Sequence, residues 1–176
     1  DVVALMALVP RAQCIVKHQL WHHWFLGALM RRAGYIRNDL EPQPLVAECR
    51  RALAAGRPLI VFPEGTRSVP GRAVRFHRGF ANIAILTGAP VLPVVITCKP
   101  VILYKGEPWW RVPPSRPVLR LAAGEVLAGD FRRRFGARGI AARRLVEYLE
   151  RYYREKTFDG RAGTGTEAAD HRRAAS

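Results

Sequence analysis

Two continuous apolar runs of strand length restrict the fold of this chain more than any other feature. Pro58–Phe62 and Val91–Thr97 are apolar at nearly every position, and segments with the apolar spacing of helices lie between and around them. Strands that are apolar on both faces are typical of a parallel sheet, since helices there cover both sides. The pattern therefore predicts an α/β fold with a mainly parallel sheet flanked by helices on both faces.

The other elements are predicted from apolar spacing and from Gly and Pro at the ends of each segment. Helices are expected at residues 1–9, 20–32, 43–55, 79–87 and 140–153, and further strands at 13–16, 35–36 and 118–121. Three parts follow from this order. Residues 1–128 form the main domain, residues 129–158 a basic C-terminal helix, and residues 159–176, which have no apolar pattern, a disordered tail.

Charge favours an anionic partner without selecting one. The 176 residues include 29 Lys and Arg against 14 Asp and Glu, which gives a net charge of +15. Lipid head groups, nucleic acid and acidic proteins would all be attracted, but a solvated arginine-rich surface explains the same number. The three cysteines form no C-x-x-C pair, which argues against a zinc ribbon or disulfide framework and favours a reducing compartment.

The loop after the first apolar run has the residues expected of a phosphate site. Phe62-Pro63-Glu64-Gly65-Thr66-Arg67-Ser68 places a carboxylate, a glycine and an arginine at the carboxyl end of a buried strand. Ligands bind at such strand ends in open α/β sheets, and Arg67 can hold a phosphate ester with two hydrogen bonds. The structural alternative is a surface turn in which Glu64 pairs with Arg67.

This seven-residue string resembles the third signature of the PlsC-like glycerol-phosphate and lysophospholipid acyltransferases. Gly34–Asp39 resembles the second signature and Ala89–Val94 the fourth, so the resemblance covers about residues 1–127. It implies a glycerol-3-phosphate acyltransferase-like fold. It also implies transfer of a fatty acyl group from acyl-CoA or acyl carrier protein to a hydroxyl of a lysophospholipid such as 1-acylglycerol-3-phosphate. No metal or other cofactor is implied.

The resemblance also implies roles for particular residues. Glu64, Gly65, Thr66 and Arg67 would form the acceptor site, with Arg67 on the phosphate. The second signature ends here in Arg37-Asn38-Asp39 instead of the more common Asp-Arg, and Arg37 is expected to replace that positive charge.

The first signature of the family, N-H-x-x-x-x-D, supplies a histidine base and an aspartate that orients it. His18, His22 and His23 fail this spacing, because no carboxylate stands five residues after any of them. Asp1 fits the aspartate better, since a helix follows it and Lys17–Trp21 matches a later segment of the family. The expectation is that the histidine lies outside this chain, which alone would be inactive.

Several residues have a structural interpretation beside a functional one. Trp109 and Trp110, with basic neighbours, are a candidate membrane contact. Arg132–Arg134 could bind anionic lipid or an acidic acyl carrier, or be solvated. The aromatic segment Trp21–Leu29 could dock on a bilayer, line an acyl groove or pack in the core. His77 could approach the acceptor phosphate or lie on a loop surface.

The resemblance implies action at the cytoplasmic face of a membrane, either peripherally or through an anchor outside this chain. A rival class is a non-enzymatic basic module that binds anionic lipid or nucleic acid. The aromatic residues gather in apolar patterns instead of alternating with arginines, which argues against nucleic acid. A third reading is an acyltransferase fold without activity. The acyl chain, the donor and the acceptor head group stay open.

Overall fold

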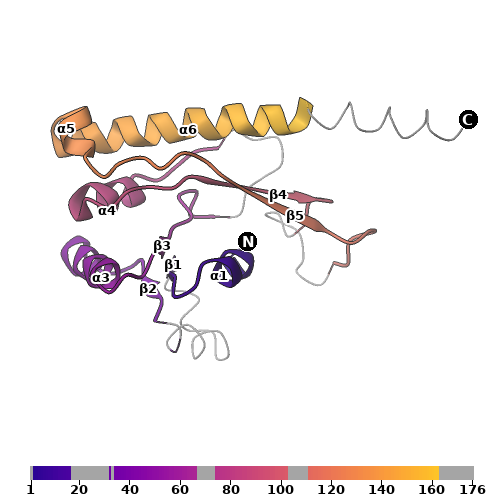
Figure 1. Ribbon diagram of the computed structural model, residues 1–176, viewed down its shortest axis with the longest axis horizontal. Helices are drawn as coiled ribbons and strands as arrows, with labels where there is room; N and C mark the ends of the chain where they lie inside the picture. Colours follow the sequence, from indigo (N-terminus) through magenta and orange to yellow (C-terminus); the bar gives the residue numbers. More distant parts are fainter. Residues whose placement is uncertain (1, 17–31, 33, 67–73, 103–110, 163–176) are drawn as a thin grey trace, which may run out of the picture.

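The computed structural model describes residues 2–16, 32, 34–66, 74–102 and 111–162. The helices are α1 (Val2–Leu8), α3 (Pro42–Ala54), α4 (Gly79–Thr87), α5 (Phe131–Phe135) and α6 (Arg138–Ala162). The strands are β1 (Gln13–Val16), β2 (Ile36–Arg37), β3 (Leu59–Ile60), β4 (Val94–Lys99) and β5 (Val118–Ala123). Helices and strands alternate from β2 to β4, as the apolar pattern predicts (Figure 1).

Three short parallel strands form the sheet that carries the sequence signatures. β1 lies in the centre, with β2 on one side and β3 on the other. Ile15 is paired with Ile36, and Cys14 with Ile60. Since the strands are parallel, their carboxyl ends meet at one edge of the sheet. The predicted α/β class with a parallel sheet is confirmed.

β4 and β5 form a second, antiparallel sheet, in which Val94 is opposite Ala123 and Lys99 is opposite Val118. The sequence pattern did not indicate this pairing. Pro93 divides the apolar run 91–97: Val91 makes an isolated bridge with Leu127, and β4 begins after Pro93 and continues to Lys99. Proline has no backbone N–H to donate to a strand ladder, which explains the interruption.

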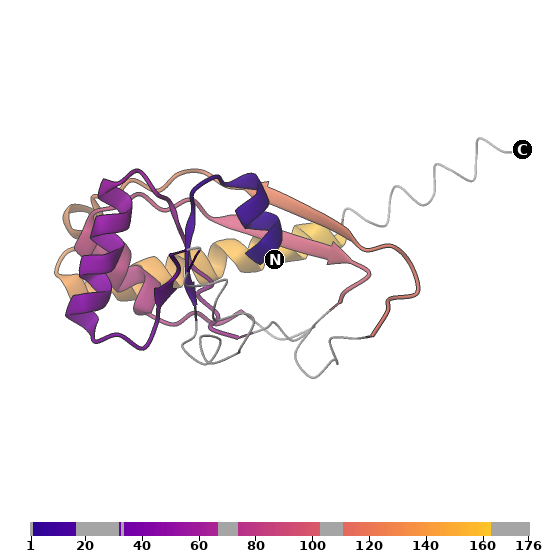
Figure 2. The same cartoon turned by 90° about the horizontal axis from the view of Figure 1, so that it is seen from below.

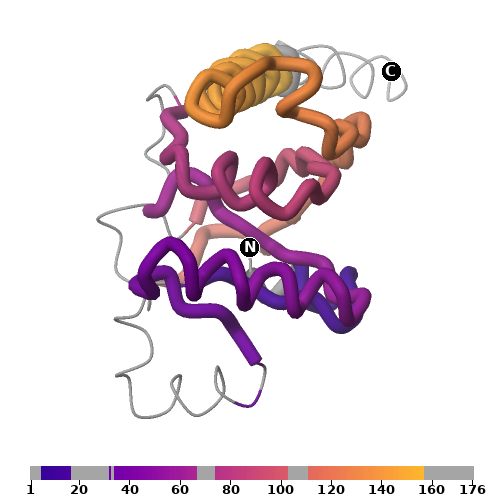
Figure 3. The backbone as a smooth tube through the Cα atoms, turned by 90° about the vertical axis from the view of Figure 1, so that its left-hand side faces the viewer, coloured from indigo at the N-terminus to yellow at the C-terminus, as the bar shows by residue number. Residues whose placement is uncertain are grey.

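Two buried apolar clusters meet at α4. We call α4, α5 and α6 the helical layer, and β1–β3 with α3 the sheet layer. Figure 3 shows α4 between α3 and the α5–α6 pair. The first cluster joins α4 to α5 and α6 through Ala81, Ala84, Ile85, Phe131, Ala141, Ala142, Leu145, Val146 and Leu149. The second joins α3 and α4 to the sheet through Ile36, Cys49, Ala52 and Ile83.

Helices lie on both sides of the three-stranded sheet. α3 and α1 lie on opposite sides of β1–β3 along the long axis of the molecule (Figure 2). The helix expected at residues 20–32 lies outside the described residues apart from Arg32. α6 continues to Ala162, beyond its expected end at residue 153, and residues 163–176 lie outside the description. The division into a main domain, a C-terminal helix and a tail stays a prediction.

Candidate functional site

The loop that follows β3 makes a tight turn at the carboxyl edge of the sheet. The Gly65 N–H donates to the Phe62 carbonyl at 3.1 Å, so Pro63 and Glu64 occupy the two central positions of a four-residue turn. Proline suits the first central position because its φ is already fixed near the required value. Gly65 has φ +62°, in the left-handed region that favours glycine. Glu64 is half-buried and Thr66 is exposed.

His77 lies directly against this turn. Its backbone N–H donates to the Pro63 carbonyl at 2.9 Å. A Cβ added to Gly65 would stand only 2.9 Å from the His77 Cδ2 atom. A side chain at position 65 would therefore be strained and would also collide with the imidazole. The structure thus places His77 at the signature loop, close to the backbone of the expected acceptor residues.

Arg37 ends β2 at the same edge of the sheet and forms a two-point ion pair with Asp39. Its Nε lies 3.0 Å from Oδ1 of Asp39, and its Nη2 lies 2.6 Å from Oδ2. Hydrogen bonding to Asp39 raises the pKa of the Arg37 guanidinium, which keeps its positive charge. Both side chains are partly exposed, at 43% and 31%. Any anion that binds Arg37 here shares the guanidinium with Asp39.

The topology places Arg37 and the Phe62–Thr66 loop at one edge, with β1 between them. Neighbouring strands are about 4.8 Å apart, so two steps across the sheet separate their backbones by about 10 Å. Four of the six expected site residues are described: Arg37, Glu64, Gly65 and Thr66. Asp1 and Arg67 lie outside the described residues, so their roles stay predictions.

Helix α6 approaches the loop from the helical layer. The Glu150 Oε1 atom accepts a hydrogen bond of 2.7 Å from the Phe76 N–H. The Tyr153 hydroxyl donates to the Val94 carbonyl at 2.9 Å and accepts from the Val94 N–H at 3.0 Å. Burial raises the pKa of Tyr153, the bond with Val94 opposes this, and the nearby Glu64 carboxylate adds to the rise. The sequence analysis missed both α6 residues, although their i, i+3 spacing puts them on one helix face.

Neither buried cysteine suits a thiolate nucleophile. Burial raises the pKa of Cys14 to about 11 and that of Cys49 to about 11, so both are protonated thiols at neutral pH. Cys14 packs in the sheet and Cys49 against it on α3. Across the described residues, no group of three or more His, Cys, Asp or Glu side chains could hold a metal ion.

The arginine run of α5 is exposed and has local partners. Arg133 pairs with Asp130 at 2.9 Å and lowers the pKa of that carboxyl group. The Arg134 guanidinium lies 5.6 Å from the centre of the Phe135 ring. Both interpretations of Arg132–Arg134 therefore stay predictions.

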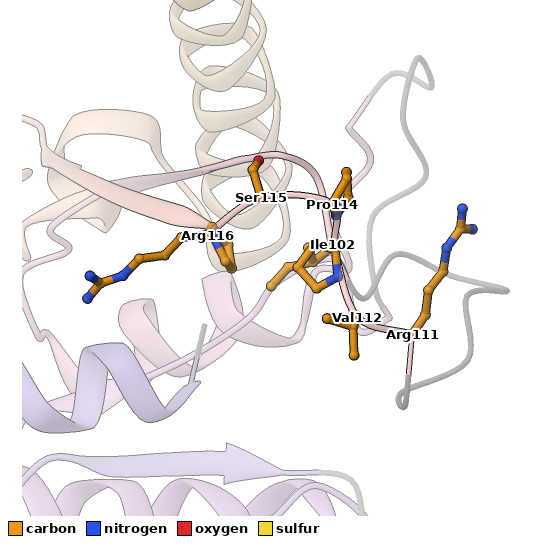
Figure 4. A pocket seen from close by; sticks show the side chains of 8 residues that line it. Ile102, Arg111, Val112, Pro114, Ser115 and Arg116 are labelled. Atoms are coloured by element: carbon orange, nitrogen blue, oxygen red, sulfur yellow. The ribbon is translucent and has the colours of Figure 1, made fainter.

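A surface pocket of about 480 Å³ lies in the segment between β4 and β5 (Figure 4). Ile102 and residues 111–117 line it, and Arg111 and Arg116 extend in opposite directions from it. None of the expected acceptor residues lines this pocket. Trp109 and Trp110, the candidate membrane contacts, lie outside the described residues.

Comparison with known proteins identifies the class to which this fold and loop belong. A model of the Acyltransferase family matches residues 1–97, which include the three-stranded sheet and the Phe62–Thr66 loop. The chain therefore belongs to the Acyltransferase family, as the signatures suggested.

Two relatives by sequence have the same name, 1-acyl-sn-glycerol-3-phosphate acyltransferase. A coconut (Cocos nucifera) 1-acyl-sn-glycerol-3-phosphate acyltransferase is 34% identical over 104 residues, 55% of this chain and 33% of its own length. A Helicobacter pylori protein of the same name is 28% identical over 166 residues, 87% of this chain and 65% of its length. The chain thus spans about a third of the coconut relative and about two thirds of the bacterial one.

A solved structure supports the fold. The crystal structure of the 1-acyl-sn-glycerophosphate acyltransferase PlsC from Thermotoga maritima superimposes with a TM-score of 0.57 and 21% identity. The match covers 89% of this chain and 61% of the crystallised one. Within the part of this chain that the structure describes, no helix is long and apolar enough to cross a membrane.

Proposed function

We propose that the protein containing this chain is a 1-acyl-sn-glycerol-3-phosphate acyltransferase in phospholipid synthesis, and that this chain holds its acceptor site. The observation that carries the proposal is the family match over residues 1–97, which includes the Phe62–Thr66 turn at the carboxyl edge of the sheet. The names of the coconut and Helicobacter relatives support the acceptor as 1-acylglycerol-3-phosphate.

The acceptor phosphate binds Arg67 in this proposal. A guanidinium offers two parallel N–H donors and a full charge to a phosphate. In the sequence, Arg67 follows the Pro63–Gly65 turn by two residues. Glu64, Gly65 and Thr66 shape the rest of the site. Arg37 supplies a second positive charge at the same edge of the sheet, where it is ion-paired with Asp39.

The chemical step requires a base. The acceptor hydroxyl oxygen attacks the thioester carbonyl carbon, a histidine takes the hydroxyl proton, the C–S bond breaks and the thiol leaves protonated. We assign that histidine to the position five residues before Asp1 in the complete protein. His18, His22 and His23 support this assignment by elimination, because none has a carboxylate five residues later. Asp1 would then hold the imidazole in the productive tautomer.

An acyl-transfer assay on the complete protein tests the proposal. Purified protein receives 1-acylglycerol-3-phosphate with either acyl-CoA or acyl carrier protein as donor, and mass spectrometry detects the diacyl product. We expect product with at least one donor and its loss when the upstream histidine is replaced by alanine. Absence of product with both donors, or another residue at that upstream position, contradicts the proposal.

We also propose that the protein works on the cytoplasmic surface of a membrane. The net charge of +15 suits anionic lipid. Lys99, Val118 and Arg120 share the exposed face of the β4–β5 pair, so cations and an apolar side chain lie together there. Co-sedimentation with phosphatidylglycerol vesicles is expected to exceed that with phosphatidylcholine vesicles. Salt-sensitive binding to an oligonucleotide without vesicle binding would favour the nucleic-acid module instead.

A further inference from the structure

Residues 74–78 connect the signature loop to α6 through two consecutive amides. The Phe76 N–H donates to Glu150 on α6, and the next amide, that of His77, donates to the Pro63 carbonyl in the loop. One strip of backbone is thus held from both sides. Phe76 and the turn that contains Glu64 and Gly65 are thus linked by adjacent backbone hydrogen bonds.

The α6 side of this connection is the stronger of the two. The Glu150 bond is 2.7 Å long and its acceptor is a carboxylate, which makes a charge-assisted hydrogen bond of the shorter and stronger kind. The Phe76 ring also packs edge-on against Tyr153, with 5.3 Å between ring centres. Tyr153 in turn is fixed by its two hydrogen bonds with Val94.

On the side of the signature loop, the connection consists of contacts between His77 and the turn. The His77 N–H donates to the Pro63 carbonyl, and the His77 imidazole fills the space that a side chain at Gly65 would need. The turn therefore contacts residues 74–78, and α6 holds the same residues from the other side.

We propose that Glu150 is a positioning residue for the acyl acceptor, because it fixes the strip 74–78 and, through His77, the Phe62–Thr66 turn. The inference rests on the acceptor function proposed above for that turn. α6 lies wholly outside residues 1–97, so the family match does not itself assign this role.

Three variants of the complete protein test the inference. Glu150→Ala removes the acceptor of the Phe76 hydrogen bond, whereas Glu150→Gln keeps an oxygen that can accept it. Glu147→Ala is the matched control: it removes a carboxylate one turn away on α6 that faces solvent and pairs only loosely with Arg143, at 3.5 Å. Amide hydrogen exchange of peptides covering 62–66 and 74–78 is measured together with KM for the lysophospholipid and for the acyl donor.

We expect Glu150→Ala to speed exchange in both peptides and to raise the acceptor KM about tenfold, within the ~100-fold that a 1 Å displacement can produce. The donor KM is expected to change less than about twofold, because the proposed function assigns this turn to the acceptor. Glu150→Gln is expected to stay within about threefold of the wild type, since its amide oxygen accepts the same bond. Glu147→Ala is expected to match the wild type.

Unchanged exchange in Glu150→Ala would overturn the connection itself. Faster exchange with unchanged acceptor KM, or an equal rise in both KM values, would overturn the positioning role and leave Glu150 as a purely structural contact. A wild-type protein that transfers no acyl group would contradict the proposed function. The exchange measurement would still decide whether Glu150 holds the loop, so the two failures are distinguishable.

Discussion

The helical layer and the sheet layer bury different kinds of side chain. The largest fully buried residues of the helical layer are Phe131 and Leu145, whereas those of the sheet layer are the small thiols Cys14 and Cys49. Burial of apolar area stabilises a fold roughly in proportion to the area removed from water. Among the described residues, the layer that carries the signature loop therefore buries the smaller side chains. This layer is joined to the helical layer by the packing of α4 and by the hydrogen bond between Phe76 and α6.

The largest expected effect is on the core of the helical layer. Leu145→Ala removes a side chain that is 0% exposed and leaves a cavity, so we expect the free energy of unfolding to fall by about 3 kcal/mol. Ile140→Ala, at a position that is 47% exposed on the same helix, is expected to change it by less than about 0.5 kcal/mol. Urea denaturation of both variants measures the two free energies of unfolding. Similar losses of stability in Leu145→Ala and Ile140→Ala would contradict the expectation.

The sheet layer is expected to weaken at alkaline pH. Burial raises the pKa of Cys14 and of Cys49 from 9.0 to about 11, so both thiols stabilise the fold fully below pH 9 and less as the pH rises to 11. Two pKa units correspond to at most about 2–3 kcal/mol for Cys14, and solvent screening makes the contribution of Cys49 smaller. Unfolding of the reduced protein between pH 8 and pH 11 measures this loss. Cys14→Ala and Cys49→Ala should each flatten the curve, and an unchanged slope in both would contradict the account.

Substitutions at two glycines with similar φ angles distinguish the cost of backbone strain from the cost of a side-chain collision. Gly56 has φ +68° and nothing within 4 Å of an added Cβ, whereas Gly65 has φ +62° and the His77 ring at 2.9 Å. Gly56→Ala is expected to reduce stability by about 1 kcal/mol from backbone strain alone, and Gly65→Ala by about 2 kcal/mol. Thermal denaturation checks the difference. Equal losses would mean that His77 does not press on the turn.

The smallest expected effect is at the link between α6 and β4. Tyr153→Phe removes the hydroxyl that bonds both backbone groups of Val94, and we expect a loss of about 1 kcal/mol. Tyr148→Phe, whose hydroxyl makes no hydrogen bond with the described residues, should have almost no effect. Chemical denaturation of the two variants is the measurement, and the reverse order would argue that α6 is not held at Val94.

Local pattern was sufficient for the elements that have clear ends. The strand Gln13–Val16 and the helix Gly79–Thr87 were predicted to the residue, because Gly79 and Gly88 bound the helix and Pro10 ends the segment before the strand. The antiparallel pairing of β4 with β5 was not predicted, since an apolar run does not specify the direction of its neighbour. Residues 129–158 were expected to form one basic helix, and the division into α5 and α6 at Gly136 was not predicted.

In the candidate site, too, local sequence predicted some features and missed those that depend on distant segments. The position of Glu64 and Gly65 beyond the carboxyl end of a strand was predicted from the apolar run Pro58–Phe62. The strand itself is shorter and less buried than expected, since β3 covers only Leu59–Ile60 and both residues are half-buried. The contacts of His77 and Glu150 were not, because they join segments as far as 74 residues apart that only the fold brings together. Asp1 and Arg67 lie outside the described residues, and their roles stay predictions.

The central claim is that Arg67 holds the acceptor phosphate at the edge of the sheet, and the most direct test is the kcat/KM of the complete protein for 1-acylglycerol-3-phosphate. We expect Arg67→Ala to lower it about 10–100-fold, as for the loss of a charged hydrogen-bond pair. Arg143→Ala, which removes an exposed arginine from α6, should leave it unchanged. Equal values for wild type and Arg67→Ala would contradict the account.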